Sequence, residues 1–144
     1  MRRGMTLVEL ILVVTIVALL SGWGTVFYGR FLTQNQVDNI GDQVVQWLRK
    51  AQVYAQMSKR SETVGWGVAV SGGQMTLYSG ATYAARNPVW DEVTAWSGSV
   101  TVSPMEVNFS RMTGVPDGPE TITVAGGNDS QVVTVNSEGT VSRI

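Results

Sequence analysis

The side chains that could do chemistry in this chain are few, because two reactive residue types are missing. Its 144 residues include no histidine and no cysteine. Histidine is the commonest general base and metal ligand, and cysteine supplies thiolates and disulfides. We therefore expect no ordinary hydrolase chemistry, no metal site and no cofactor. One carboxylate is unusual, because Glu9 is the only charged residue in the apolar run 5–28.

The position of Glu9 indicates a functional role. The apolar run is long enough to cross a hydrocarbon core of about 30 Å as one helix. An acidic residue at the centre of a membrane helix costs roughly 2.5–3.5 kcal/mol, so a charge in such a segment is by default a functional residue with a partner. We therefore expect residues 5–28 to form a transmembrane helix in which Glu9 pairs with a cation.

Two simpler interpretations of the N-terminus stay open at this point. Residues 1–3 could be the basic start of a secretory signal peptide, with a small-residue cleavage site at Gly22-Trp23-Gly24. A plain signal anchor with an incidental Glu9 is the second. A carboxylate near the start of the apolar region counts against the signal peptide, and cleavage there would remove the helix that the following stretch continues.

The stretch "RRGMTLVELILVVTIVALL" resembles the class III signal of type IV prepilins and type II secretion pseudopilins. It combines basic residues, a glycine, Thr-Leu-Val-Glu-Leu and an apolar run. The resemblance implies that a prepilin peptidase removes residues 1–4 by cutting after Gly4 on the cytoplasmic side, and that it methylates the new N-terminal residue, Met5. Met5 stands where phenylalanine is commoner. Glu9 falls on the family's glutamate.

Cleavage after Gly4 would provide a partner for Glu9. It creates a free α-ammonium group at Met5, and methylation of an amine preserves the charge. If subunits stack with an axial shift of about one helical turn, the ammonium of one chain meets Glu9 of its neighbour, and poor hydration strengthens the attraction. Desolvation offsets much of this gain, so we expect the pair to fix the register of assembly by penalising an unpaired Glu9.

Beyond the apolar run the sequence pattern becomes amphipathic. Apolar residues recur at spacings of three and four, which predicts one buried stripe along a helix. No proline occurs before Pro88, so we expect the membrane helix to continue through residues 29–60 and to end near Lys59-Arg60. The predicted stripe consists of Ile40, Val44, Leu48, Ala51 and Ala55.

After residue 60 the period shortens to two, which predicts a β-rich head over residues 61–144. "ETVGWGVAV" and "QMTLYS" flank Ser71-Gly72-Gly73, a composition typical of a β-hairpin turn. Further alternating runs follow, and the last short strand is "TVSRI". Residues 80–98 show no sustained period and are expected to be an irregular connection. The predicted fold class is α+β, a pilin-like arrangement of one long N-terminal helix packed on an antiparallel β-rich head.

The head is similar to that of the GspH/FimT-like group of minor pseudopilins and minor pilins. The similarity rests on "WLRKAQVYAQMSKR", on "VGWGVAV" and on the closing "VVTVNSEGTVSRI". Many members have arginine after the glycine that corresponds to Gly139, whereas Thr140 follows here. Only Arg143 supplies a cation near the C-terminus. The DNA-contact site that this position would imply in some members is therefore not expected.

The tryptophans are expected to serve packing more than recognition. Trp47 lies near the apolar face of the predicted helix, and Trp23 lies near the membrane boundary, where tryptophan is enriched. Trp90 and Trp96 fall in the irregular segment. For these two, packing in the head and contact with another subunit stay equally open.

Loop carboxylates and scattered cations complete the set of candidates. Hard cations such as Ca²⁺ need six or more oxygen ligands, and no spaced set of that size is present, so we expect solvated turn residues. A DNA-binding head would need a basic patch assembled by folding. The loop residues are Asp91, Glu92, Asp117, Asn128 and Asp129, and the basic residues are Lys59, Arg60, Arg86 and Arg143.

We expect a structural, minor filament subunit and not an enzyme. Its partners would be the prepilin peptidase, other pilin or pseudopilin subunits, an inner-membrane assembly platform and, before assembly, membrane lipid. It would cross the inner membrane once, with its head on the non-cytoplasmic side, and then enter a pilus or pseudopilus. A DNA-binding minor pilin for DNA uptake and a membrane-anchored binding protein are the alternatives, although nucleic acid is not expected as a partner. A type IV pilus, a type II secretion pseudopilus and a competence pilus all fit the sequence.

Overall fold

A computed structural model describes residues 5–60, 63–96 and 98–144, with the backbone alone for residues 23–27. The chain divides into two units, Met1–Leu32 and Thr33–Ile144. One helix, α1 (Leu7–Gln56), contributes to both of them. In the first unit the described apolar side chains of α1 are exposed, from Leu7 with 75% of its surface accessible to Leu20 with 70%. In the described part of the chain, no helix combines the length and the apolar character needed to cross a membrane.

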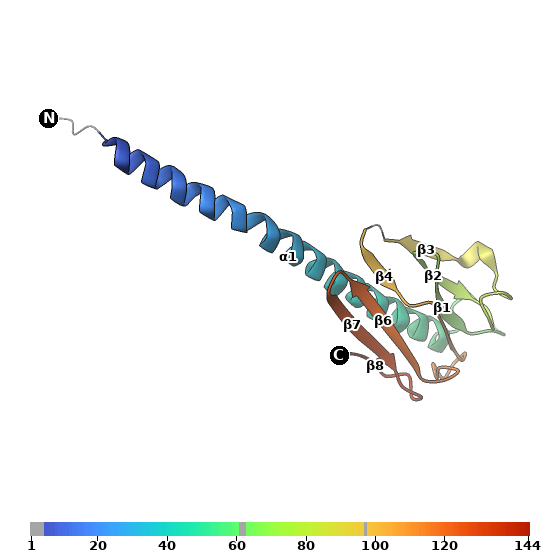
Figure 1. Ribbon diagram of the computed structural model, residues 1–144. Helices are drawn as coiled ribbons and strands as arrows, with labels where there is room; N and C mark the ends of the chain where they lie inside the picture. Colours follow the sequence, from blue (N-terminus) through green and yellow to red (C-terminus); the bar gives the residue numbers. More distant parts are fainter. Residues whose placement is uncertain (1–4, 61–62, 97) are drawn as a thin grey trace. The chain divides into compact units, whose positions relative to one another are not determined.

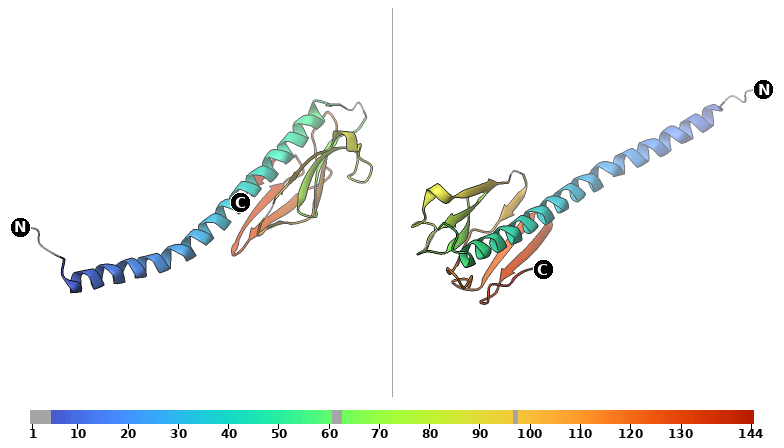
Figure 2. Two further views of the ribbon diagram at one scale, coloured as in Figure 1. Left: turned by 90° about the horizontal axis from the view of Figure 1, so that it is seen from above. Right: turned by 180° about the vertical axis from the view of Figure 1, so that it is seen from behind.

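In the second unit, α1 buries the predicted stripe of apolar side chains. All five predicted positions are buried, and Val37 extends the stripe by one turn towards the N-terminus. Residues 33–56 lie along both β-sheets of this unit (Figure 2). Because apolar residues recur every three or four positions, they form one face of this half of α1, and that face packs on the sheets. Polar residues such as Gln43 and Gln46 lie on the exposed face.

The helix ends at Gln56, before the predicted end at Lys59-Arg60, in a Schellman turn. The Lys59 amide donates to the Tyr54 carbonyl (3.0 Å), and the Ser58 amide donates to the Ala55 carbonyl (3.1 Å). The Lys59 ammonium lies 3.5 Å from the centroid of the Tyr54 ring. Ser58 has φ +48°, in the left-handed region that such a turn requires and that glycine occupies without a steric penalty.

Replacing Ser58 by glycine is expected to stabilise the fold slightly. The left-handed conformation costs an L-residue roughly 1–2 kcal/mol, while the added freedom of glycine in the unfolded chain costs about 0.4–1 kcal/mol. We expect Ser58→Gly to raise the free energy of unfolding by about 0.5 kcal/mol, measured from the urea midpoint. The matched control is Ser130→Gly in strand β7, which should lower it; a loss of stability in both variants would contradict the argument.

Within residues 5–60, 63–96 and 98–144, eight strands form two antiparallel sheets with the orders β3-β2-β1-β5 and β4-β6-β7-β8 (Figure 1). This α+β arrangement confirms the predicted fold class. Their bounds are β1 (Trp66–Ser71), β2 (Gln74–Ser79), β3 (Glu92–Ala95), β4 (Val100–Val102), β5 (Met105–Phe109), β6 (Glu120–Gly126), β7 (Asp129–Val135) and β8 (Val141–Arg143). A short 3-10 helix, η1 (Pro88–Trp90), precedes β3.

The predicted hairpin and the last short strand are both present. β1 and β2 pair from Trp66 with Ser79 to Ser71 with Gln74, and Gly72 and Gly73 form the turn with φ +61° and +77°. Both angles lie in the left-handed region that glycine adopts without a steric penalty, which explains the composition of the turn. β8 pairs with β7 after the turn that contains Gly139.

The two sheets are linked by a stretch that changes sheet at Pro104. Before it, β4 pairs with β6, and the Ser103 amide continues this ladder to the Thr123 carbonyl (2.9 Å). After it, β5 pairs with β1. Proline has no amide hydrogen to donate to a ladder, so it suits the point at which one ladder stops and the other starts.

Candidate functional site

The N-terminus of α1 is built by two residues that bond each other's backbone. The Glu9 amide donates to Thr6 Oγ1 (3.3 Å), and the Thr6 amide donates to Glu9 Oε2 (3.5 Å). This reciprocal pair is a capping box, which satisfies backbone donors that a helix start leaves free. The Thr-Leu-Val-Glu sequence carries the signature of this box, and sequence reasoning that attended only to charge missed it.

The capping box gives the Glu9 carboxylate a defined place. It lies in the first turn of α1, where the partial positive charge of the helix N-terminus favours an anion. Oε2 is used by the chain itself, and among the described residues no cation forms an ion pair with Glu9. Among the same residues, Oε1 accepts no hydrogen bond.

Of the other predicted site residues, the structure describes Met5, which precedes Thr6. Met5 is the first described residue, and 60% of its surface is exposed. Gly4 and the rest of the segment 1–4 lie outside the described residues. Cleavage after Gly4 would therefore leave only Met5 before the capping residue Thr6.

Farther along the apolar part of α1, two hydroxyl groups are bonded to the helix itself. Thr15 Oγ1 donates to the Ile11 carbonyl, and Ser21 Oγ donates to the Val17 carbonyl, both at 2.7 Å. Such bonds satisfy hydroxyl donors locally. The described surface of this segment is therefore apolar, with the Glu9 carboxylate as its charged group.

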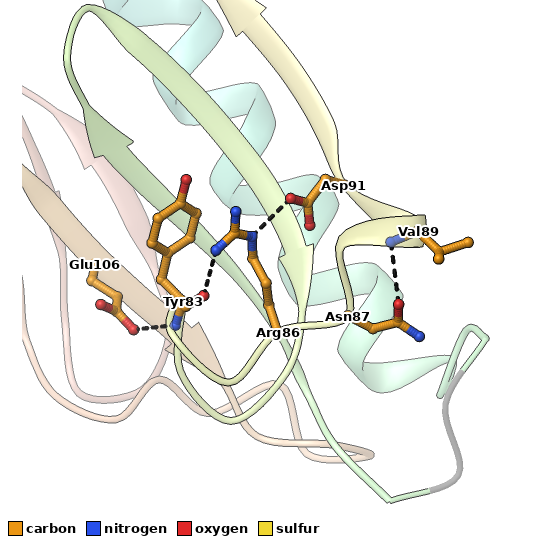
Figure 3. Close-up of polar contacts among 6 residues, drawn as sticks. All are labelled: Tyr83, Arg86, Asn87, Val89, Asp91 and Glu106. Carbon is orange, nitrogen blue, oxygen red and sulfur yellow. Dashed lines mark hydrogen bonds and ion pairs between the residues drawn. The ribbon is translucent and has the colours of Figure 1, made fainter.

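The predicted irregular segment 80–98 contains a defined polar network (Figure 3). Glu106 Oε1, on β5, accepts from the Tyr83 amide (2.7 Å) and from the buried Tyr78 hydroxyl (3.2 Å). Arg86 Nε donates to Asp91 Oδ2 (2.7 Å), and Arg86 Nη1 donates to the Tyr83 carbonyl (2.8 Å). The segment is thus fixed to the face of β5 and β2 that points away from α1.

The side-chain amides of two asparagines, Asn108 and Asn87, form further hydrogen bonds within this segment or to it. Asn108 Nδ2 donates to the carbonyls of Gly80 and Ala81. Asn87 Oδ1 accepts from the Val89 amide (3.1 Å) and caps η1 (Figure 3). The segment is irregular in secondary structure, as predicted, but β3 lies within it.

Two groups of this network are held in their protonated forms. Burial raises the pKa of the Tyr78 phenol well above its usual range, and the adjacent Glu106 carboxylate raises it further. The hydrogen bond to Asp91 raises the pKa of the Arg86 guanidinium. Both groups keep one protonation state, which suits a structural role.

The tryptophans of the head serve packing. Trp66 is fully buried, and its indole donates to the Lys59 carbonyl (2.7 Å). Trp47, Trp90 and Trp96 are half-buried against the core. The packing expected of Trp47 is confirmed, and for Trp90 and Trp96 the structure supports the packing alternative. The side chain of Trp23 lies outside the described residues.

The scattered charged residues do not gather into one site. Arg86 pairs with Asp91 and Arg143 pairs with Asp42, while Lys59 and Arg60 lie over different aromatic rings, those of Tyr54 and Trp90. In the ranges that the structure describes, no group of three histidine, cysteine, aspartate or glutamate side chains is placed to hold a metal ion.

Comparison with known proteins locates one similarity, and it covers the helix start described above. Residues 1–25 match the family model described as the prokaryotic N-terminal methylation motif. The chain therefore carries a type IV pilin-like signal at its N-terminus, with the capping box inside the matched residues. No curated protein and no solved structure matches the chain.

Proposed function

We propose that this protein is a structural subunit of a type IV pilus or type II secretion pseudopilus, assembled through its N-terminal helix. The observation that carries the proposal is the methylation motif over residues 1–25. The exposed apolar surface that follows Glu9 supports it, because a surface of this kind is buried when helices associate. Proteins with this signal act by assembly, and we assign no enzymatic activity.

The proposed sequence of events starts at a membrane. A prepilin peptidase cuts after Gly4 and methylates Met5, with Arg2 and Arg3 holding residues 1–4 on the cytoplasmic side. Residues 5–28 are held in the inner membrane before assembly and lie in the filament core afterwards. Residues 29–60 continue the helix to the head, residues 61–144, which lies outside the cytoplasm. Other subunits and an inner-membrane assembly platform are the partners.

We further propose a minor subunit of the GspH/FimT-like kind. The support is the resemblance of the stretches around the end of α1, in β1 and in β7–β8, together with the absence of the paired C-terminal cysteines common in major type IVa pilins. A minor subunit places its head at the filament tip or at few positions along it.

The test of the proposed function is processing by a prepilin peptidase. Coexpression with the peptidase should remove residues 1–4 and add one methyl group to Met5, read from the intact mass of the purified protein. Gly4→Leu should block both changes, because in this family the peptidase tolerates little beyond a hydrogen at that position. The matched control is Gly22→Leu, at the alternative small-residue site, which should leave processing unchanged.

The same measurement identifies the alternatives. A mass that corresponds to cleavage after Gly24 would show a secretory signal peptide. A mass that keeps all of residues 1–4 in the presence of an active peptidase would show a plain signal anchor. Either result would refute the proposed function.

A further inference from the structure

Strand β3 is one of the two border strands of its sheet, next to β2 (Figure 1). The register pairs Met75 with Thr94, and the Trp96 amide donates to the Gly73 carbonyl (3.4 Å). Backbone groups alternate in direction along an antiparallel strand. Those of Glu92 and Thr94 therefore point to β2, and the amides and carbonyls of Val93 and Ala95 point outwards.

These outward groups of β3 have no partner within the described chain. No hydrogen bond reaches the backbone of Val93 or Ala95 from the described residues. Both residues are exposed, Val93 with 56% of its surface accessible. Two amides and two carbonyls, at alternate positions of one strand, are thus presented to the surroundings.

The other edge strands, β4, β5 and β8, differ from β3 in their outward backbone groups. On each of them at least one outward carbonyl is bonded by another part of the chain, which is how proteins blunt sheet edges. These bonds are Arg49 Nη2 to Val141 O (3.5 Å) on β8, Trp96 Nε1 to Val100 O (3.1 Å) on β4 and Asp117 N to Asn108 O (2.9 Å) on β5.

The contacts next to β3 also leave its edge clear. Arg86 is bonded back to Asp91 and Tyr83, so the preceding segment is fixed on the face of the sheet. Glu92 turns towards α1 and pairs with Lys50 (2.5 Å). No lysine or proline interrupts residues 92–95, although these are the residues that commonly prevent strand addition.

We propose that β3 is an interface strand, and that a second copy of this chain adds its own β3 antiparallel to this edge. A two-fold axis at Thr94 uses all the outward groups, because Val93 then lies opposite Ala95 of the second copy and both pairs exchange two hydrogen bonds. The apolar Val93 and Ala95 side chains meet across the junction, and threonine lies opposite threonine.

Charge supports a second copy in this register. Glu92 lies opposite Trp96 of the second copy, so no like charges are directly opposed. Its carboxylate is also paired within its own chain, with Lys50. The ladder is short, so the association is weak in dilute solution. It becomes significant where copies are held at high local concentration, as in the plane of one membrane.

The experiment uses single cysteines in the full-length chain, which has none of its own. Thr94→Cys places two thiols across the two-fold axis in a non-hydrogen-bonded pair, where Cα atoms lie about 4.5 Å apart, within the range for a disulfide. In detergent micelles under mild oxidation, the disulfide dimer should form several-fold faster than for Thr123→Cys, an exposed control on the inner strand β6.

Two second-site changes test whether the strand edge is responsible. Ala95→Pro removes an outward amide without removing a hydrogen bond to β2, so the double variant Thr94→Cys/Ala95→Pro should keep its circular dichroism spectrum and cross-link at the control rate. If Ala95→Pro disturbs folding, Val93→Lys at an exposed position provides the same test. Equal rates for Thr94→Cys and Thr123→Cys, or a rate that neither edge change lowers, would overturn the proposal.

Discussion

Glu9→Val is expected to reach the membrane as well as the parent protein and yet to be lost from assembled filaments. The substitution removes a residue that membrane insertion penalises, so membrane abundance should stay equal or rise. Cleavage after Gly4 should persist. In the filament, however, the α-ammonium of Met5 from a neighbouring chain would meet valine and remain a desolvated, unpaired charge, which costs about 3–5 kcal/mol when one partner of a buried pair is removed.

Glu9→Val alone cannot separate the two properties of Glu9, its cap and its charge. Glu9 both caps α1 through Thr6 and carries a charge, and valine removes both properties. Glutamine keeps the reciprocal bonds of a capping box and removes only the charge. Because loss of a cap costs about 0.5–2 kcal/mol, less than an orphaned buried charge, we expect Glu9→Gln to be nearly as defective as Glu9→Val.

The measurement is the amount of tagged subunit in sheared filaments or cross-linked pseudopilus complexes, normalised to membrane abundance. Glu9→Asp, shorter by one methylene, should retain part of the incorporation. Incorporation of Glu9→Gln at the parental level, with Glu9→Val defective, would show that capping and not charge is the essential property. Parental incorporation of Glu9→Val would remove any assembly role for the carboxylate.

Leu48→Ala is expected to destabilise the head by about 2–5 kcal/mol, because it leaves a cavity among fully buried side chains. Leu48 is 0% exposed in the stripe between α1 and the sheets. The measurement is the urea midpoint of a soluble fragment that lacks residues 1–28 and should be monomeric, since most of the apolar segment has been removed.

A second truncation on the same helix provides the control for Leu48. Val53 lies five residues farther along α1 and is 46% exposed. Val53→Ala also removes methyl groups, but on an exposed face, so it should change the stability by no more than about 0.5 kcal/mol. Equal midpoints for Leu48→Ala and the parent fragment would mean that α1 does not pack on the sheets through this stripe.

The helix and strands were predictable where a period of the sequence matched burial. The spacing of Ile40, Val44 and Leu48 already defines one helix face, and alternation defines the strands near the C-terminus. Alternating apolar residues also predicted β1 and β2, although both faces of these two strands are buried. The end of α1 was predicted too late. Ser58 is not glycine, so its left-handed turn leaves no compositional signal, whereas Lys59-Arg60 gave a misleading one.

The structural features that could not be predicted from the sequence depend on contacts between residues far apart in the chain. The segment around Arg86 is held in place largely by hydrogen bonds to Glu106 and Asn108 on β5. No local sequence pattern predicts such contacts. The sheet change at Pro104 was also not predictable from local sequence, because β4 pairs with β6 whereas β5 pairs with β1. At the candidate site, by contrast, the information is local, and the capping box follows from Thr6 and Glu9 alone.

The sheet change at Pro104 has a mechanical consequence for the proposed role in a filament. A subunit in a filament carries tension, and two sheets held together only by side-chain packing could be pulled apart one after the other. Here one continuous stretch, residues 100–109, supplies a strand to each sheet. The stretch between β4 and β5 is too short to extend far, so the two sheets should not slide past each other until β4 or β5 leaves its ladder.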